Sequence, residues 1–316
     1  MTNLDEILGT RLQIPVADAI AVHGDENVKF VDGSWWLPNQ NRNARQEFEI
    51  GPRIRGAIFL DIDDVANKGA SSNPKNLPHM MPSAKLFSAA MDAMSIVNKD
   101  HLIVYGQEGC PYLHRAWYQF ICMGHDNSKV HLLEGSFQDW EEADGPVDIS
   151  AKNVMKVAEL DLSNPTSYTA IEARNIMDMD RVRQICDNTS EEDTNNVTIV
   201  DARSPDRFYG RVDEPRPGLR LGHMPGAKNV FFMDLLNANH PSQLKAIADL
   251  EKVFSKAGVN VYGSNRIVAS CGSGATACTI VAALTACGRD PSTLYVYDGS
   301  WTEWGADPGV PITKED

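Results

Sequence analysis

Short runs of β-branched and other apolar residues alternate with stretches of helical patterning along the whole chain. The clearest helical stretches cover residues 83–96, 116–123 and 277–287. Strands that alternate with helices indicate a parallel sheet covered by helices on both faces. The pattern therefore predicts an α/β fold.

The pattern occurs twice, in the same order in both halves of the chain. Apolar runs at residues 30–32, 55–59, 102–106 and 132–136 are matched by runs at 199–201, 225–230, 267–271 and 295–300. The offset is 169 residues from Asp32 to Asp201 and 164 residues from Gly135 to Gly299, as expected of a diverged repeat. The sequence predicts two tandem domains, residues 1–150 and 151–316, joined by a polar connector.

Length, net charge and hydrophobicity exclude some classes of binding partner. The length of 316 residues suits two domains with a core each, and the net charge of −14 argues against nucleic acid. The sequence has no apolar run of about 18 residues and no basic or Arg-rich start, so we expect no membrane partner and a cytoplasmic protein. Removal of a targeting segment would make it mitochondrial.

The six cysteines show neither paired metal spacing nor a secretory context. We expect them to be reduced, and we expect no metal and no cofactor. Cys278 and Cys287 lie in or beside an apolar helix, where free cysteine is commonly a core residue.

Cys271 stands apart from the other cysteines. Residues 267–277 run from an apolar strand through a glycine-rich loop into an apolar helix, and Cys271 lies at the turn. Loop N–H groups and a helix N-terminus should converge on the sulfur, so we expect a lowered pKa for the Cys271 thiol. This placement predicts a nucleophilic cysteine.

The first half has no equivalent cysteine. Gly106 occupies the matching strand end, and Cys110 follows four positions later. Pro111 comes next and has no N–H to contribute to a cradle. We therefore expect a structural role for Cys110 and a catalytic centre in the second half alone.

The loop disfavours several kinds of cysteine chemistry. A Cys-x₅-Arg phosphatase needs an arginine where this chain has Ala277. Neither a papain-like signature nor a set of metal ligands surrounds Cys271. A thiolate that accepts a sulfur atom, carries it as a persulfide and passes it on fits the loop better.

Several ordered segments, together with the loop, carry a resemblance to a known family: residues 32–38, 59–63, 78–83, 201–208, 214–218, 222–227 and 297–301. On these segments the chain resembles the tandem-domain rhodanese superfamily, and its loop looks like that of the mercaptopyruvate sulfurtransferase branch. The resemblance implies two rhodanese-like α/β domains with an active site in the cleft between them. It also implies a small-molecule sulfur donor, with thioredoxin, low-molecular-weight thiols or cyanide as acceptors.

The resemblance further implies a donor. Relatives that use thiosulfate typically carry basic residues in the loop, whereas this loop has neutral Gly272 and Ser273, which favours 3-mercaptopyruvate. Arg207 and Arg216 match the two arginines that hold the donor's carboxylate in the family. The remaining cradle residues implied are Gly274, Ala275 and Thr276.

A relay to the leaving group is implied by the same family. Its serine, histidine and aspartate match Ser273, His79 and Asp63, although residues 67–76 make the spacing from Asp63 to His79 longer than usual. Such a relay can deliver a proton as pyruvate enolate leaves. A thiosulfate sulfurtransferase and a noncatalytic rhodanese-like binding module remain as alternatives.

Other matched positions are expected to be scaffold. Asp201 and Arg203 should anchor a strand end, and His223 should support the turn before Pro225. Trp301 and Trp304 should pack a helix on the sheet.

Overall fold

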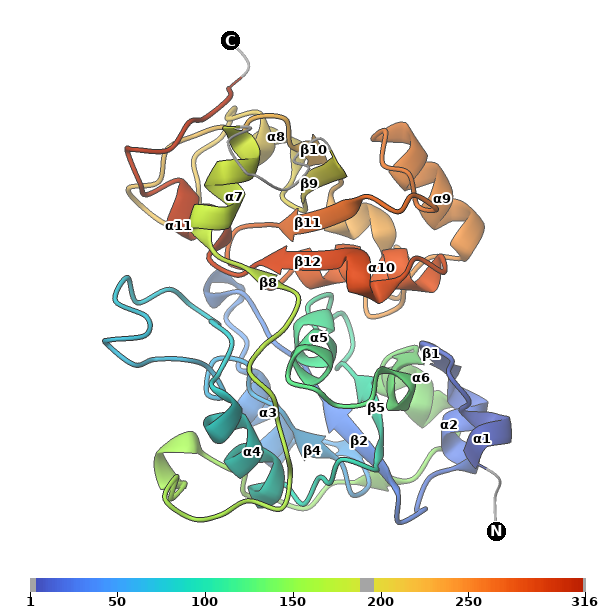
Figure 1. Cartoon of the computed structure of the whole chain (residues 1–316). Coiled ribbons are helices and arrows are strands. Elements are labelled where there is room, and N and C mark those ends of the chain that lie inside the picture. The colour runs from blue at the N-terminus through green and yellow to red at the C-terminus, as the bar shows by residue number, and fades with distance from the viewer. Residues whose placement is uncertain (1–3, 188–195, 315–316) are drawn as a thin grey trace. The chain divides into compact units, whose positions relative to one another are not determined.

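The computed structural model describes residues 4–187 and 196–314, so residues 1–3 of the N-terminal segment considered above lie outside it. The chain forms two compact units (Figure 1). The N-terminal unit comprises Met1–Ala66, Pro82–Arg174 and Leu236–Leu244, and the C-terminal unit comprises Asn67–Met81, Asn175–Leu235 and Lys245–Asp316. Residues 67–81 thus cluster with the unit that carries Cys271.

Each unit is built on a five-stranded parallel sheet. The N-terminal sheet has the order β4 (Ile58–Phe59), β2 (Val28–Asp32), β5 (His101–Tyr105), β6 (Val130–Glu134) and β1 (Gln13–Pro15). The C-terminal sheet has the order β10 (Lys228–Asn229), β9 (Val197–Asp201), β11 (Arg266–Ser270), β12 (Leu294–Tyr297) and β8 (Ile176–Met177). The two orders match strand for strand, which confirms the α/β fold and the repeat expected from the sequence.

Helices flank both sheets, and Figure 1 labels them. In the N-terminal unit they are α1 (Leu4–Ile7), α2 (Val16–Ala21), α3 (Ala44–Ile50), α4 (Ala84–Ala93), α5 (His114–Cys122) and α6 (Phe137–Glu142), with 3-10 turns η1 (Pro38–Gln40), η2 (Asn127–Lys129) and η3 (Val157–Glu159). In the C-terminal unit they are α7 (Met179–Cys186), α8 (Pro205–Phe208), α9 (Ile247–Lys256), α10 (Ala277–Ala286) and α11 (Ser300–Trp304), with η5 (Phe232–Leu235) and η6 (Pro291–Thr293). A small antiparallel pair, β3 (Arg53–Ile54) and β7 (Val147–Asp148), completes the N-terminal unit.

Local chemistry explains several helix starts. Ser83 accepts a hydrogen bond from the Leu86 N–H at 3.3 Å, and Asp178 accepts one from the Arg181 N–H at 2.8 Å, so each caps its helix. Trp140 of α6 lies in the N-terminal core, and Trp301 and Trp304 of α11 lie in the C-terminal core; all three are fully buried. The two C-terminal tryptophans are scaffold, as the sequence suggested. Within the described residues, no helix has the length and apolar character needed to cross a membrane.

Candidate active site

Cys271 follows β11, the central strand of the C-terminal sheet, which pairs with β9 on one side and β12 on the other. In the register Ser270 lies opposite Asp201, so Cys271 starts the loop at the carboxyl edge of the sheet. The loop ends at Ala277, where α10 begins. The strand, loop and helix expected from the sequence are therefore present around this sulfur.

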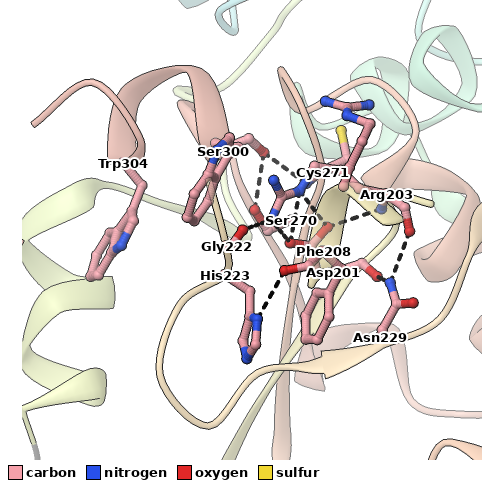
Figure 2. A network of polar contacts seen from close by, with 12 residues as sticks. Asp201, Arg203, Phe208, Gly222, His223, Asn229, Ser270, Cys271, Ser300 and Trp304 are labelled. Carbon is pink, nitrogen blue, oxygen red and sulfur yellow. Dashed lines mark hydrogen bonds and ion pairs between the residues drawn. The ribbon is translucent and has the colours of Figure 1, made fainter. Parts of the chain in front are cut away.

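The N-terminus of α11 fixes the orientation of the first loop peptides. The Trp301 N–H donates to the Cys271 carbonyl at 3.0 Å, and the Thr302 N–H donates to the Gly272 carbonyl at 2.9 Å. The Thr302 hydroxyl also donates to the Gly272 carbonyl, at 2.6 Å. The Cys271 N–H in turn donates to Ser300 Oγ at 3.1 Å, a contact drawn in Figure 2. Both loop carbonyls are thus held by α11.

Several backbone N–H groups of the loop after Cys271 remain open to a ligand within the described residues. Among residues 4–187 and 196–314, the N–H groups of Gly272, Ser273, Ala275 and Thr276 have no hydrogen-bond acceptor. Gly274, between them, has a φ of +82°, which L-residues rarely adopt. Successive N–H groups of this kind bind anions, and here they follow the cysteine directly.

Arg207 lies against the loop. A Cβ atom built on Gly272 would be 3.0 Å from a terminal nitrogen of Arg207, so glycine gives the guanidinium its room. The Glu214 carboxylate accepts from Arg207 Nη2 at 2.5 Å and from Nε at 3.2 Å. The side chain of Arg207 is 24% exposed, whereas that of Glu214 is 2% exposed. A buried carboxylate therefore aims a partly open guanidinium at the Cys271 loop.

Glu214 also joins a buried ion cluster with Arg203 and Asp201. Arg203 donates to both oxygens of Asp201, to Glu214 at 2.7 Å and to the Gly222 carbonyl at 2.8 Å. Its guanidinium lies 4.1 Å from the ring centroid of Trp301. Arg203 and Asp201 are scaffold in the structure, and through Glu214 they support Arg207.

The other expected scaffold residue, His223, stacks on Phe208 with 3.8 Å between ring centroids. Its Nδ1 lies 2.9 Å from the Phe208 carbonyl oxygen (Figure 2). His223 is buried, and it packs α8 rather than contributing to the cysteine loop. Arg216 lies half-buried on the segment between α8 and β10.

His79 belongs to the C-terminal unit although its segment precedes α4. It is 6% exposed and has a φ of +57°, unusual for a residue with a Cβ. Two residues later the Met81 N–H donates to Asp298 Oδ2 at 2.7 Å, and Lys75 pairs with Glu303 at 2.9 Å. These contacts attach the His79 segment to the end of β12 and to α11.

Asp63 lies in the N-terminal unit, between β4 and α4. Its Oδ2 accepts a hydrogen bond from the indole N–H of Trp35 at 2.7 Å. Of the residues expected to form the site, the structure therefore groups Cys271, its loop, both arginines and His79 in one unit, and Asp63 in the other.

The N-terminal repeat preserves the same frame without the thiol. Gly106 follows β5, and its carbonyl accepts from the Phe137 N–H at 2.9 Å, as the Cys271 carbonyl does from Trp301. Cys110 is fully buried, and burial raises the pKa of its thiol to about 11. This fits the structural role expected for Cys110. In the described part of the chain, no group of three or more His, Cys, Asp or Glu residues could hold a metal ion.

Sequence reasoning assigned no role to Glu214, Asp298, Ser300 or Thr302. The only signal for Ser300 was its match to Ser136 in the repeat. Glu214, Asp298 and Thr302 act through contacts between segments that are distant or irregularly spaced in sequence.

Comparison with known proteins agrees with this architecture. The model of the rhodanese-like domain matches residues 16–143 and 187–307. The 3-mercaptopyruvate sulfurtransferase of Escherichia coli (strain K12) is 33% identical over 298 residues, 94% of this chain and 96% of the relative. Thiosulfate/3-mercaptopyruvate sulfurtransferase 1, mitochondrial, of Arabidopsis thaliana is 32% identical, over 91% of this chain and 74% of the relative.

A solved structure is similar over nearly its whole length. The Tum1 protein of Saccharomyces cerevisiae aligns with a TM-score of 0.79 and 28% identity, covering 97% of this chain and 99% of that one. The chain therefore belongs to the family of proteins with rhodanese-like domains and, within it, to the sulfurtransferase enzymes.

Proposed function

We propose that the chain transfers sulfur from 3-mercaptopyruvate to a thiol or cyanide through a persulfide on Cys271. The Cys271 thiolate attacks the donor sulfur, so an S–S bond forms while the C–S bond of the donor breaks. The electron pair of that bond leaves with pyruvate enolate, which takes up one proton to give pyruvate. An acceptor thiolate or cyanide then attacks the outer sulfur and returns Cys271 as a thiolate.

The Cys271 loop gives the main support for this proposal. Four N–H groups without an acceptor in the described chain, those of Gly272, Ser273, Ala275 and Thr276, follow Cys271 directly. A persulfide anion is a larger anion than a thiolate, and a cradle of several N–H groups suits it. The loop has no side-chain charge of its own, so the cradle is fitted to one negative charge rather than to a phosphate or thiosulfate dianion.

Arg207 and Arg216 are proposed to bind the carboxylate of the donor. Arg207 supports this role because its partly exposed guanidinium lies beside Gly272 and is held from behind by Glu214. A planar guanidinium binds a carboxylate through two parallel hydrogen bonds. The name of the relative from Escherichia coli gives the same donor, and the name of the relative from Arabidopsis thaliana gives both thiosulfate and 3-mercaptopyruvate.

Ser273, His79 and Asp63 are proposed to deliver the proton that the enolate needs. The acceptor is proposed to be thioredoxin or a low-molecular-weight thiol, in the cytoplasm, or in mitochondria where a targeting segment has been removed. A thiol acceptor needs a reducing compartment, which also keeps Cys271 reduced.

Intact mass spectrometry tests the persulfide. The protein is exposed to 3-mercaptopyruvate without an acceptor, and we expect a gain of one sulfur atom that dithiothreitol removes. Cys271→Ser should gain none, while Cys110→Ser should gain one like the parent protein, because the raised pKa of Cys110 keeps that thiol protonated. If no donor adds sulfur, a noncatalytic rhodanese-like binding module becomes the better proposal.

Donor kinetics test the substrate. We expect a higher kcat/KM for 3-mercaptopyruvate than for thiosulfate with cyanide as the common acceptor. A tenfold preference for thiosulfate, about 1.4 kcal/mol in transition-state free energy, would instead identify a thiosulfate sulfurtransferase.

A further inference from the structure

A cavity lies in the C-terminal unit, beside the edge strand β10. Its volume is about 860 Å³, and α8, β10, η5 and α9 contribute to its lining. The lining includes neither Cys271 nor any residue of its loop, nor Arg207 or Arg216. This cavity is therefore separate from the site described above.

One wall of the cavity is aromatic. The rings of Phe208 and His223 stack with centroids 3.8 Å apart and planes 10° apart. Tyr209 meets both rings edge-on, at interplanar angles of 88° and 89°. Phe231 adds a fourth ring to the lining. Flat apolar groups bind well beside such rings.

Three lysines lie around the same cavity, although the chain as a whole carries a net charge of −14. Lys228 Nζ donates to the Gly258 carbonyl, and Lys245 Nζ donates to the Asp234 carbonyl at 2.7 Å. Lys256 lies in the last turn of α9. Within the described residues none of the three forms a salt bridge. Since an ammonium group has three donors, each lysine retains donors for a ligand.

Nearby acids do not cancel this charge. Asp234 is the one carboxylate in the lining, and its printed contact with Lys245 is made by its backbone carbonyl. The pKa of the Asp249 carboxyl on α9 is lowered mainly by its pair with Lys252 at 2.9 Å and less by the charge of Lys245. Neither Asp249 nor Lys252 lines the cavity. The cavity thus combines three cations and one anion with an aromatic wall.

We propose that this cavity binds a small organic anion with a flat apolar body, of the aryl carboxylate or aryl sulfonate class. Phe208 and His223 are buried and support the wall, so the ring of the ligand packs on the partly exposed rings of Tyr209 and Phe231. Its acidic group lies between the ammonium groups of Lys228 and Lys245. Backbone carbonyls hold both ammonium groups in place, so little side-chain entropy is lost on binding.

Isothermal titration with naphthalene-1-sulfonate tests the proposal. The protein is first carboxamidomethylated with iodoacetamide and also carries Arg207→Gln, so that the Cys271 site does not compete for the anion. We expect one saturable site per chain. The double variant Lys228→Gln/Lys245→Gln should weaken binding at least tenfold, and Lys256→Gln, whose ammonium makes no hydrogen bond to the described chain, should weaken it severalfold without affecting Tm.

The matched control is Lys252→Gln, an exposed lysine of α9 that does not line the cavity. It should change the dissociation constant by less than twofold. The proposal is overturned if neutral naphthalene-1-sulfonamide binds as tightly as the sulfonate, if Lys256→Gln leaves the affinity unchanged, or if Lys252→Gln weakens binding as much.

Discussion

The carboxylate of Asp298 accepts a hydrogen bond from the backbone N–H of Met81 at 2.7 Å, so the end of β12 holds the segment that carries His79. Asp298 is buried, and it is followed by the residues that begin α11 and support the Cys271 loop. The residues that follow β12 thus contact both the cysteine loop and the histidine segment.

Asp298→Ala should lower kcat about tenfold, because loss of a buried charged acceptor loosens the His79 segment by roughly 1.5–3 kcal/mol. Asp298→Asn retains a carbonyl oxygen at the same place and should restore most of the rate. Alkylation of Cys271 by iodoacetamide should be unaffected in both. Equal losses of kcat in the two variants would contradict a positioning role. Lys75→Ala removes a half-exposed ion pair of the same segment and should lower kcat less than Asp298→Ala does.

Arg216→Lys should raise KM for 3-mercaptopyruvate and leave the rate of Cys271 alkylation intact. The substitution keeps a positive charge but removes the fork that binds a carboxylate through two hydrogen bonds. Steady-state kinetics with both sulfur donors measure the effect. An unchanged preference between 3-mercaptopyruvate and thiosulfate would count against Arg216 as part of the clamp.

Gly272→Ala should raise KM for the donor about fivefold, roughly 1 kcal/mol, with little change in Tm. The new Cβ would lie 3.0 Å from Arg207, which Glu214 holds from the other side, so the guanidinium must shift. A double-mutant cycle isolates this contact. In an Arg207→Lys background, Gly272→Ala should raise KM much less than it does in the parent protein. If the two effects on KM were fully additive, the contact between residue 272 and Arg207 would have no role in donor binding.

Arg203→Lys should destabilise the protein by about 3 kcal/mol, since it breaks the fork to Asp201 and the contact with Trp301 inside the core. Urea unfolding measures the change. Arg11→Lys is the matched control, because its pair with Asp18 is exposed and should be worth less than about 0.5 kcal/mol. A similar loss of unfolding free energy in both variants would contradict a stabilising role for Arg203.

Acid should destabilise the N-terminal unit through a buried imidazole pair. His101 Nδ1 lies 3.1 Å from His131 Nε2, and burial followed by the charges of His101, Arg11 and His125 lowers the pKa of His131 to about 4. An unfolded histidine has a pKa of about 6.5. The unfolded chain therefore binds protons first, and stability falls from pH 6.5 to pH 4 by roughly 3 kcal/mol from this group.

Urea midpoints at pH 7 and pH 5 check this prediction. His131→Gln should reduce the loss of stability between the two pH values by about 2 kcal/mol. Part of the loss should remain, because burial also lowers the pKa of His114, to about 3. His23→Gln, which lies outside the pair, should retain the parental loss, and an unchanged loss in His131→Gln would contradict the assignment.

The pattern of hydrophobic and polar residues predicted the central strands of both sheets and the loop after β11, because these segments have strong apolar periodicity. It missed β1 and β8, which have three and two residues and exist only through pairing with β6 and β12. The support of Arg207 by Glu214 could not be predicted either, since the two lie seven positions apart on a mostly irregular segment with no periodic pattern. Placement of His79 with the cysteine depends on Asp298, a contact across 217 residues.

The hydrogen bonds from α11 to the carbonyls of Cys271 and Gly272 have a further consequence. They set the loop dipoles before any charge arrives, whereas water must reorient around an ion in solution. The sulfur anion that we propose at Cys271 would meet peptide dipoles that are already fixed, so we expect the reorganisation free energy of its surroundings to be small. We therefore expect the hydrogen bonds from α11 to lower the free-energy barrier to forming that anion.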